Sequence, residues 1–330
     1  MKNSIFILAV LIGQFCFAQT IEKFSIDSGG DSAVNGDIEV LYTLGEVNVQ
    51  ELNVGDISVS EGFISTSFKI SIDAKVFLQG PLLNPATPGL MNDDLRALGY
   101  IPTTSPYVDA ATAAGTVFDL GGTSGTGLPE DDIVDWVWIE VRRANDNTKV
   151  TRGRSALVQR DGDIVDTDGL SVVTLNAAPT FYYIVVEHRN HLAAMSSATL
   201  VLSEDSAAVV DFKDSGFTTF GSNARVDMGS GNWALWTGDT DGTNKVKFSG
   251  ASNSTNVIKD YILADPSNVL NFITFGSTGY FDIDVDLNGI GKFSGSSNDS
   301  NIIKDNVLAH PGNILNFITY SISETVPPKN

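Results

Sequence analysis

Two acidic loops near the C-terminus carry the side chains whose spacing points most clearly to chemistry. The segment DTDGTNK begins at Asp239 and the segment DVDLNGI begins at Asp284, and in both the oxygen-bearing side chains alternate along the chain. A calcium ion takes roughly six to eight oxygen ligands, and a tight loop can supply them from alternate positions. The spacing therefore predicts a Ca²⁺ site in each loop.

Each loop is expected to use its side chains at positions 1, 3 and 5 and its main-chain carbonyl at position 7. These ligands are Asp239, Asp241, Thr243 and Lys245 in the first loop and Asp284, Asp286, Asn288 and Ile290 in the second. Thr243 offers a neutral oxygen, so the first loop is predicted to bind calcium more weakly. With two or three charges facing each ion, the dissociation constants should be on the order of 10⁻⁴ to 10⁻³ M.

Neither loop ends in the acidic residue that completes an EF-hand, because Gly250 and Gly295 stand at position 12. A polar cluster after each loop is the expected source of the missing oxygens. Its members are Asn253 and Asn256 after the first loop and Asn298, Asp299 and Asn301 after the second, with Asp260 and Asp305 as more distant candidates. The alternative is that both loops are turns, rich in turn-forming residues, that bind no ion.

The loops belong to a duplication in which residues 239–275 recur as residues 284–320. After each loop the apolar residues stand at helical spacing, so each copy is predicted to be a loop followed by a helix. The turns NVLNF and NILNF that follow are expected to return the chain to the apolar face of the partner copy. Trp236, directly before the first loop, is expected to be a buried plug between domains.

The rest of the chain has a mainly β pattern. The N-terminal region 20–70 reads as a β meander, and region 71–215 as strands of a sandwich with one helix at 91–99, from Asn92 as N-cap to Gly99 as the stop. Residues 216–236, rich in Gly, Ser and Asn, are predicted to be a linker, and 321–330 a tail. The predicted strands are 38–44, 47–52, 57–59, 74–78, 134–142, 154–159, 171–175, 181–188 and 198–202.

Residues 1–18 resemble a secretory signal peptide whose removal would take away Cys16, the only cysteine. A lipidated Cys16 is the alternative. The 40 acidic residues outnumber the 20 basic ones, and the net charge of −20 disfavours nucleic acid and anionic membranes as partners. No later apolar run reaches the roughly 18 residues that a membrane-spanning helix needs. A secreted, extracellular or cell-surface protein is expected, with the periplasm also open.

Other groups of reactive residues are weaker signals. The acidic loop 161–168 is interpreted as a solvated turn, although a further cation there stays open. His188 and His191 are expected to point to opposite faces of one strand, one packed and one exposed, and so not to share a zinc ion. The glycine-rich run 121–127 lacks the end of a phosphate loop, and no nucleophile motif occurs.

Several motifs together resemble a known kind of protein. The segment WTGDTDGTNKVKF and its second copy are similar to the dockerin-like, EF-hand-type calcium repeats of secreted Bacteroidota-type surface proteins. MNDDLRALGYIP, DWVWIEVR, RSALVQRDGDIVD and YYIVVEHRNHLAAM are similar to an Ig-like β domain found beside those repeats. The resemblance implies an Ig-like β-sandwich at 71–215 followed by two dockerin-like repeats at 237–320, in a modular surface protein.

The resemblance also favours a non-catalytic role in adhesion, matrix formation or scaffolding, with an extracellular protein or polysaccharide as partner. The alternative is a carbohydrate-binding accessory protein or a hydrolase of polysaccharide use, since facing carboxylates are the machinery of glycoside hydrolysis. Relatives often carry a C-terminal secretion signal, whereas this sequence ends in SISETVPPKN, so the secretion route is left open.

Overall fold

The computed structural model describes residues 29–35, 38–44, 50–54, 57–61, 68–121 and 128–330. The chain divides into two compact units, residues 1–67 and residues 68–330. Among the described residues of the first unit there are two antiparallel strand pairs in separate sheets, and the predicted single meander is not seen in them. The pairs are β1 (Gly29–Asn35) with β2 (Ile38–Leu44), and β3 (Gln50–Val54) with β4 (Ile57–Glu61). The predicted signal peptide lies outside the described residues.

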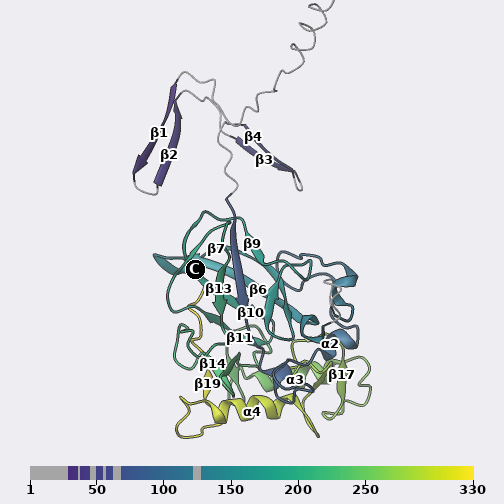
Figure 1. Ribbon diagram of the computed structural model, residues 1–330. Helices are drawn as coiled ribbons and strands as arrows, with labels where there is room; N and C mark the ends of the chain where they lie inside the picture. Colours follow the sequence, from purple (N-terminus) through teal and green to yellow (C-terminus); the bar gives the residue numbers. More distant parts are fainter. Residues whose placement is uncertain (1–28, 36–37, 45–49, 55–56, 62–67, 122–127) are drawn as a thin grey trace, which may run out of the picture. The chain divides into compact units, whose positions relative to one another are not determined.

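A nine-stranded sheet is the framework of the second unit (Figure 1). Its order is β11 (His191–Met195), β10 (Thr180–His188), β6 (Ile133–Arg143), β7 (Asp146–Gln159), β8 (Asp163–Val165), β5 (Ile70–Lys75) and β13 (Ala208–Asp211), with β12 (Leu200–Leu202) beside β10 and β9 (Val173–Leu175) beside β5. All neighbours are antiparallel except β5 and β13. The mainly β prediction is thus confirmed, whereas a two-sheet sandwich is not, because the described strands of this region form one sheet.

The sheet curls so that β12, which lies beside β10, comes close to β5 and β13. The N–H of Ser71 in β5 donates to the carbonyl of Ser203, just beyond β12, at 2.9 Å. Strand β6 is rich in β-branched and aromatic residues, which favour strands, and its Trp136 and Ile139, which point to opposite faces of the sheet, are both fully buried in the main core. Burial on both faces of β6 explains why its polar residues, such as Asp135, must find partners inside the protein.

Short helices lie beside the sheet. The predicted helix 91–99 is present only as α2 (Asp94–Ala97), with Asp93 at the N-cap position. Asn92 is not the cap, because its side chain instead accepts from Ala86 N–H and donates to the Asn84 carbonyl. Gly99 ends the helix as predicted, with a φ of +69° that favours glycine. Three 3₁₀ helices are η1 (Gly80–Leu82), η2 (Gly115–Phe118) and η3 (Pro129–Asp131).

The predicted linker 216–236 is instead a packed hairpin of β14 (Arg225–Gly229) and β15 (Asn232–Leu235). Leu235 is buried in the main core, and its N–H donates to the Phe77 carbonyl at 2.8 Å. Because this segment is part of the core, the sheet and the two repeats form one compact unit rather than two domains joined by a flexible bridge.

Each repeat is a loop followed by a helix, as the spacing predicted: α3 (Ser254–Ala264) and α4 (Asp299–Ala309). Ile258, Ile303 and Val307 share a second apolar cluster with Trp236, which is buried as expected. Short strands next to one repeat pair with short strands next to the other. The strand after the first loop, β16 (Val246–Lys247), pairs with β19 (Ser321–Ile322), which follows the second repeat. The strand after the first repeat, β17 (Gly276–Thr278), pairs with β18 (Ile290–Lys292), which follows the second loop.

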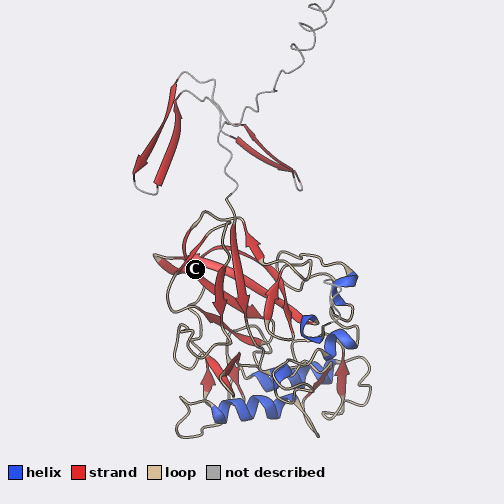
Figure 2. Ribbon diagram, viewed as in Figure 1, coloured by secondary structure: helices blue, strands red, loops and turns tan. Residues whose placement is uncertain are grey.

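The turns that follow α3 and α4 do not return to the apolar face of the partner copy. Their large side chains are exposed, for example Leu270 at 72% and Leu315 at 70%. Figure 2 shows α3 and α4 side by side, with the strands of the sheet gathered on one side of them. In the described part of the chain, no helix combines the length and apolar character needed to cross a bilayer.

Candidate metal centre

Three aspartates of the second repeat meet in one place. Ligand oxygens of Asp284, Asp286 and Asp299 all lie within 4.8 Å of one another. Asp284 and Asp299 are almost fully buried, at 0% and 1% exposure, and Asp286 is half-buried. The first two belong to the loop before β18, and Asp299 is the first residue of α4. The loop and the helix start therefore form one carboxylate cluster.

Backbone hydrogen bonds hold these carboxylates in position. Asp284 accepts from Asn288 N–H at 3.1 Å and from Gly289 N–H at 2.8 Å. Asp299 accepts from Val285 N–H at 2.8 Å and from Lys292 N–H at 2.7 Å. The tight turn needs a φ of +86° at Gly289, which glycine adopts without strain. The helix and the loop are thus tied together through Asp299.

The η1 segment packs closely against the same loop. A Cβ on Gly80 would lie 2.2 Å from the carbonyl oxygen of Val285. Only glycine allows the two backbones this near to each other, so the framework of the sheet region supports the second loop directly.

The protein supplies no positive charge that neutralises the carboxylate cluster among the residues that the structure describes. Burial, followed by the neighbouring Asp286 carboxylate, raises the pKa of Asp284 to about 8, although Arg189 opposes this rise. Burial, then Asp286 and Asp284, raises the pKa of Asp299 well above its usual range, and burial also raises the pKa of Asp286. Among the described residues, no Lys or Arg forms an ion pair with these three within 4.0 Å. Protons or a cation must balance the charge.

The remaining ligands predicted for this loop have other partners. Asn288 donates from its side-chain nitrogen to Asp286 at 2.9 Å, and its side-chain oxygen accepts from Ile290 N–H at 2.9 Å. Asn298 caps α4, because its side chain accepts from Asn301 N–H at 2.9 Å and donates to the Gly295 carbonyl at 2.6 Å. Of the predicted polar cluster after the loop, only Asp299 joins the carboxylates.

The outermost candidates lie on the surface. The exposed side-chain oxygen of Asn301 accepts from Lys304 at 3.2 Å, and Asp305 is a surface residue 3.8 Å from the same lysine. Asn256 and Asp260 in the first repeat have the same relation to Lys259. Neither pair turns toward its loop.

The first loop has the same shape but fewer charges. Asp239 is buried at 4% exposure and accepts from Thr243 N–H at 3.0 Å and from Asn244 N–H at 2.7 Å. Asp241 is exposed and accepts from the Thr243 hydroxyl at 2.7 Å. Burial raises the pKa of Asp239 to about 7. Lys245 is exposed, and Asn253 caps α3 through Asn256 N–H at 2.8 Å.

The difference between the loops is the residue that begins the helix. Ser254 stands where the second repeat has Asp299, and its hydroxyl accepts from Lys247 N–H at 3.2 Å as Asp299 accepts from Lys292. The first loop therefore lacks the third carboxylate. Thr243 was the predicted reason for a weaker first site, whereas Ser254 is the larger difference. Aligning the two copies residue by residue would have revealed it.

The histidine pair is arranged differently from the prediction. His188 and His191 are both buried, and their Nδ1 atoms lie 2.9 Å apart. They do not share a strand: His188 ends β10 and His191 begins β11, so a two-residue turn places them opposite each other. Burial lowers the pKa of both rings, which makes them neutral near pH 7.

The ring nitrogens of both histidines already contact other protein groups, so the pair is a poor zinc site. His188 Nε2 lies 3.1 Å from Asp135, and His191 Nε2 accepts from Gly80 N–H at 3.1 Å. Because Nε2 of His191 accepts, its proton is on Nδ1, which lies 2.8 Å from the side-chain oxygen of Asn190. Zinc needs a free imidazole nitrogen from each ligand, and these rings offer none.

The turn between the histidines connects the sheet to both acidic loops. The carbonyl of the fully buried Asn190 accepts from Gly238 N–H and Asp239 N–H, each at 3.0 Å. The side-chain nitrogen of Asn190 donates to the carbonyls of Asp282 at 3.2 Å and Asp284 at 2.6 Å. One residue of the β10–β11 turn thus holds both loops.

Two aspartates of the acidic loop 161–168 form ion pairs with nearby cations. Asp163 pairs with Lys75 at 2.6 Å, and Asp166 pairs with Arg154 at 2.6 Å. These pairs support the interpretation of a turn over that of a further cation site. Most of the glycine-rich run 121–127 lies outside the described residues.

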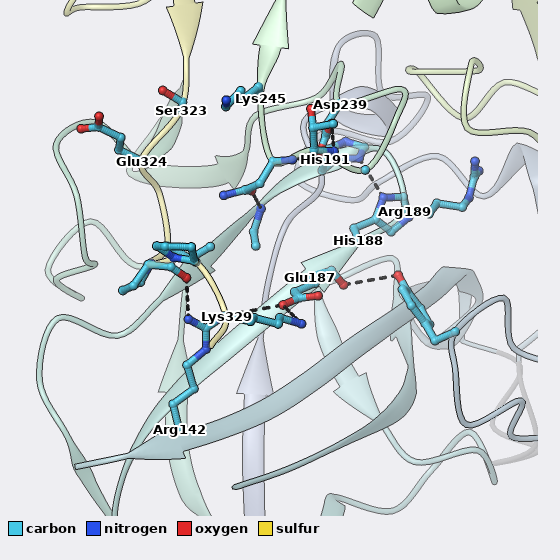
Figure 3. A pocket seen from close by; sticks show the side chains of 18 residues that line it. Arg142, Glu187, His188, Arg189, His191, Asp239, Lys245, Ser323, Glu324 and Lys329 are labelled. Atoms are coloured by element: carbon cyan, nitrogen blue, oxygen red, sulfur yellow. Dashed lines mark hydrogen bonds and ion pairs between the residues drawn. The ribbon is translucent and has the colours of Figure 1, made fainter. Parts of the chain in front are cut away.

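A cavity of about 690 Å³ lies beside the first loop, between the β10–β11 region and the C-terminal segment (Figure 3). Arg142 is fully buried here and donates to Glu140 and to the Pro327 carbonyl, both at 2.7 Å. Lys329 bridges Glu140 at 2.9 Å and Glu187 at 2.8 Å. The charged groups of this wall therefore neutralise one another and fasten the C-terminal segment to the sheet.

The chain matches no known family model, no curated protein and no solved structure. The likeness to dockerin-like repeats and to an Ig-like domain therefore stays a prediction from the sequence.

Proposed function

We propose that the chain is a non-catalytic secreted or cell-surface protein whose repeats are stabilised by one Ca²⁺ ion at Asp284, Asp286 and Asp299. The single observation that carries this proposal is the buried carboxylate cluster, whose oxygens lie within 4.8 Å of one another. Buried charges are normally paired or coordinate metals. Without an ion, the raised pKa values of Asp284 and Asp299 mean that these carboxyl groups hold protons more tightly than usual. A bound divalent cation would replace those protons.

The chemistry of the donors favours calcium over other common ions. All three acidic groups are oxygen donors, whereas zinc prefers nitrogen and sulfur, and the chain has one cysteine in total. Magnesium demands a near-ideal octahedron, whereas calcium accepts irregular cages of oxygen atoms. The expected affinity stays in the weak extracellular range, on the order of 10⁻⁴ to 10⁻³ M.

The ion would act as a conformational staple. Asp299 starts α4, the loop carries the other two aspartates, and Asn190 ties the loop backbone to the sheet. Neutralising the cluster would therefore stabilise helix, loop and sheet together. A stiffened repeat unit suits an adhesion, matrix or scaffolding role, with an extracellular protein or polysaccharide as partner. The net charge of −20 argues against nucleic acid.

A polysaccharide-related function is the second candidate, because the cavity of about 690 Å³ has the size of a small-ligand site. Its acidic Glu187 is paired with Lys329, which weakens the case for a hydrolytic pair of carboxylates. Selective binding on a glycan array would favour this candidate, and turnover of a chromogenic glycoside would establish an enzyme.

Thermal unfolding tests the calcium proposal. At about 10 mM Ca²⁺, binding in the expected range adds roughly 1.4–2.7 kcal/mol to the free energy of unfolding. That corresponds to a rise in Tm of roughly 3–5 °C for a unit of this size. The double substitution Asp284→Ala and Asp286→Ala should remove the gain. A wild-type Tm that changes neither with calcium nor with chelator would contradict the proposal.

A further inference from the structure

Hydrogen bonds to the histidine pair, His188 and His191, assign the position of the proton on each neutral ring. Nε2 of His188 faces the Asp135 carboxylate at 3.1 Å, and an ionised carboxylate only accepts, so this nitrogen carries the proton. The proton of His191 is on Nδ1, because its Nε2 accepts from Gly80 N–H. Nδ1 of His188 is therefore left to accept from Nδ1–H of His191, 2.9 Å away.

Asn190, in the turn between the two rings, supports this arrangement independently. Its side-chain nitrogen donates to the carbonyls of Asp282 and Asp284, so its side-chain oxygen is the atom that faces Nδ1 of His191 at 2.8 Å. An amide oxygen only accepts, which again requires a proton on this Nδ1. The donors therefore all point one way, from Gly80 N–H through both rings to the Asp135 carboxylate.

Neither ring can take a second proton without losing a buried hydrogen bond. The two unprotonated nitrogens are Nε2 of His191 and Nδ1 of His188, and each already accepts an N–H. A proton on the first would face Gly80 N–H, and a proton on the second would face Nδ1–H of His191. Both histidines are buried, so a displaced donor would be left without a partner, which costs more than the bond itself.

The charges around the pair do not compensate for an added proton. Burial lowers the pKa of both rings, although Asp135 opposes this for His188. Asp135 is itself paired with Arg189 at 3.0 Å and accepts from the Tyr280 hydroxyl at 2.6 Å. Burial raises the pKa of Asp135, but Arg189 and His188 outweigh it and bring the value down to about 2. The other titratable groups near the rings are Glu187 at the end of β10, Asp282 before the second loop, Asp239 in the first loop and the phenol of Tyr107.

The pair lies where the sheet meets the repeats. His188 ends β10, His191 begins β11, and the Gly80 that bonds to His191 is the first residue of η1. The η1 segment packs directly on the second loop, at the carbonyl of Val285. Both histidines line the cavity of about 690 Å³ (Figure 3), which gives protons from solvent a path to the rings. Loss of the Gly80 bond would thus free η1 at the place where it supports the loop.

We propose that the histidine pair is an acid-sensitive latch, which holds the sheet to the repeats only while both rings are neutral. In acid, an added proton breaks either the bond to Gly80 or the contact between the rings. Because the sheet and the repeats form one compact unit, loss of the latch weakens the whole unit. The inference goes beyond the calcium proposal and does not depend on it, since no carboxylate of the metal centre bonds to either ring.

The direction of the pH effect follows from the difference between the folded and unfolded states. A histidine in an unfolded chain has a pKa of about 6.5, whereas the folded protein keeps both rings unprotonated below that pH. The stabilisation is therefore present above about pH 6.5 and is lost as the pH falls below it. From about pH 7.5 to about pH 5.5, the equilibrium constant of unfolding should rise up to roughly tenfold for each histidine.

Urea unfolding of the full chain in chelator, at about pH 7.5 and about pH 5.5, tests the latch against the variant His188→Gln with His191→Gln. Glutamine retains a donor for Asp135 and an acceptor for Gly80 N–H, but it takes no proton. The acid-induced rise in the unfolding constant should be up to roughly 100-fold larger in the wild type than in this variant.

His310→Gln is the matched control, because it removes the third histidine and leaves the pair intact. It should retain most of the wild-type response to acid. The aspartate cluster is present in all three proteins, so its titration cancels in the comparison. The proposal is overturned if the double variant responds to acid as strongly as the wild type, or if His310→Gln alone abolishes the response.

Imidazole ¹⁵N NMR of the wild type tests the latch without any substitution, and so applies even if the double variant does not fold. The expected spectrum has His188 protonated on Nε2 and His191 protonated on Nδ1, with both rings neutral for as long as the protein stays folded. Opposite tautomers would contradict the assigned hydrogen bonds. A ring that gains a proton near pH 6.5 in the folded protein would equally overturn the latch.

Discussion

At the scale of single residues, the second acidic loop concentrates negative charge that its surroundings do not neutralise. Asp284 and Asp299 are buried, and Asp286 lies close enough to raise the pKa of both. Arg189, whose charge opposes the rise in the pKa of Asp284, is already paired with Asp135 at 3.0 Å. Without an ion, the folded protein keeps Asp284 mostly protonated near neutral pH, because its pKa is about 8.

This charge makes the ion-free protein sensitive to alkali. An unfolded aspartate has a pKa of about 3.9, whereas that of Asp284 is about 8 in the folded state. The stabilisation is complete below about pH 4 and is lost as the pH rises toward 8. In chelator, the Tm of the wild type should therefore fall between about pH 5 and pH 8 relative to the variant Asp284→Asn with Asp299→Asn.

Comparison with that variant is necessary because other groups titrate in the same window. His188 and His191 have lowered pKa values, so their contribution to stability increases with pH and opposes the aspartates. Calcium should reduce the difference between wild type and variant in how Tm depends on pH. A pH profile that is the same for both proteins in chelator would contradict the assigned pKa shifts.

Ser254 allows a gain-of-function test. Ser254→Asp places a carboxylate where the second repeat has Asp299, so it should add a second calcium site to the first loop. In chelator, the same change should lower the Tm, because it adds a buried charge near Asp239. Calcium should restore the stability, as melting curves with and without the ion would show. Lower stability in both conditions would mean that the two loops are not equivalent.

At the scale of elements, α3 and α4 begin in the same way, with Asn253 and Asn298 as N-caps. The sequence predicted both helices because their apolar spacing is local information. It also predicted that Asn298 and Asp299 would both complete the ion cage. Which of two neighbouring side chains turns into the helix cap and which into the cluster depends on packing, and spacing alone does not determine it.

The cap assignment gives a direct prediction. Asn298→Ala should lower the free energy of unfolding by about 1 kcal/mol through the lost cap, while calcium affinity stays unchanged. Asn253→Ala, at the equivalent cap of the first repeat, is the matched control and should have a similar effect. A tenfold loss of calcium affinity in Asn298→Ala alone would show that Asn298 is a ligand.

The histidine pair shows why one strand was missed. The predicted strand 181–188 ends at His188 as β10 does, but β11 (His191–Met195) was not predicted, because the run from Phe181 to Met195 contains no glycine or proline to signal a tight turn between two strands. In the structure, the turn is stabilised from outside. Arg189 pairs with Asp135, and Asn190 bonds to backbone groups of both repeats. These partners are distant in sequence, which is why the pattern did not reveal them.

At the scale of the whole molecule, buried polar bonds join the sheet to the repeats. Gln79, beside η1, accepts from Thr237 N–H at 2.9 Å and donates to the Asn306 side chain of α4 at 2.7 Å. Asn190 adds its bonds to both loops. Since breaking these contacts would strand buried polar groups, the repeats and the sheet should not unfold separately.

Calorimetry tests this coupling. Residues 68–330 should unfold in a single endotherm whose calorimetric and van't Hoff enthalpies agree, and calcium should move the whole endotherm. A flexible linker at 216–236 would instead separate the repeats from the sheet. Two endotherms of comparable enthalpy, of which calcium moves only one, would contradict the single unit.

The most direct test of the central claim is isothermal titration of calcium into the chelator-treated protein. The three-aspartate cluster predicts one site per chain for the wild type, with a dissociation constant on the order of 10⁻⁴ to 10⁻³ M, and no measurable site in Asp299→Ser. Asp299→Ser gives the second loop the residue that the first loop has, so it removes one carboxylate and little else. No calcium binding by the wild type, or unchanged binding by Asp299→Ser, would contradict the account.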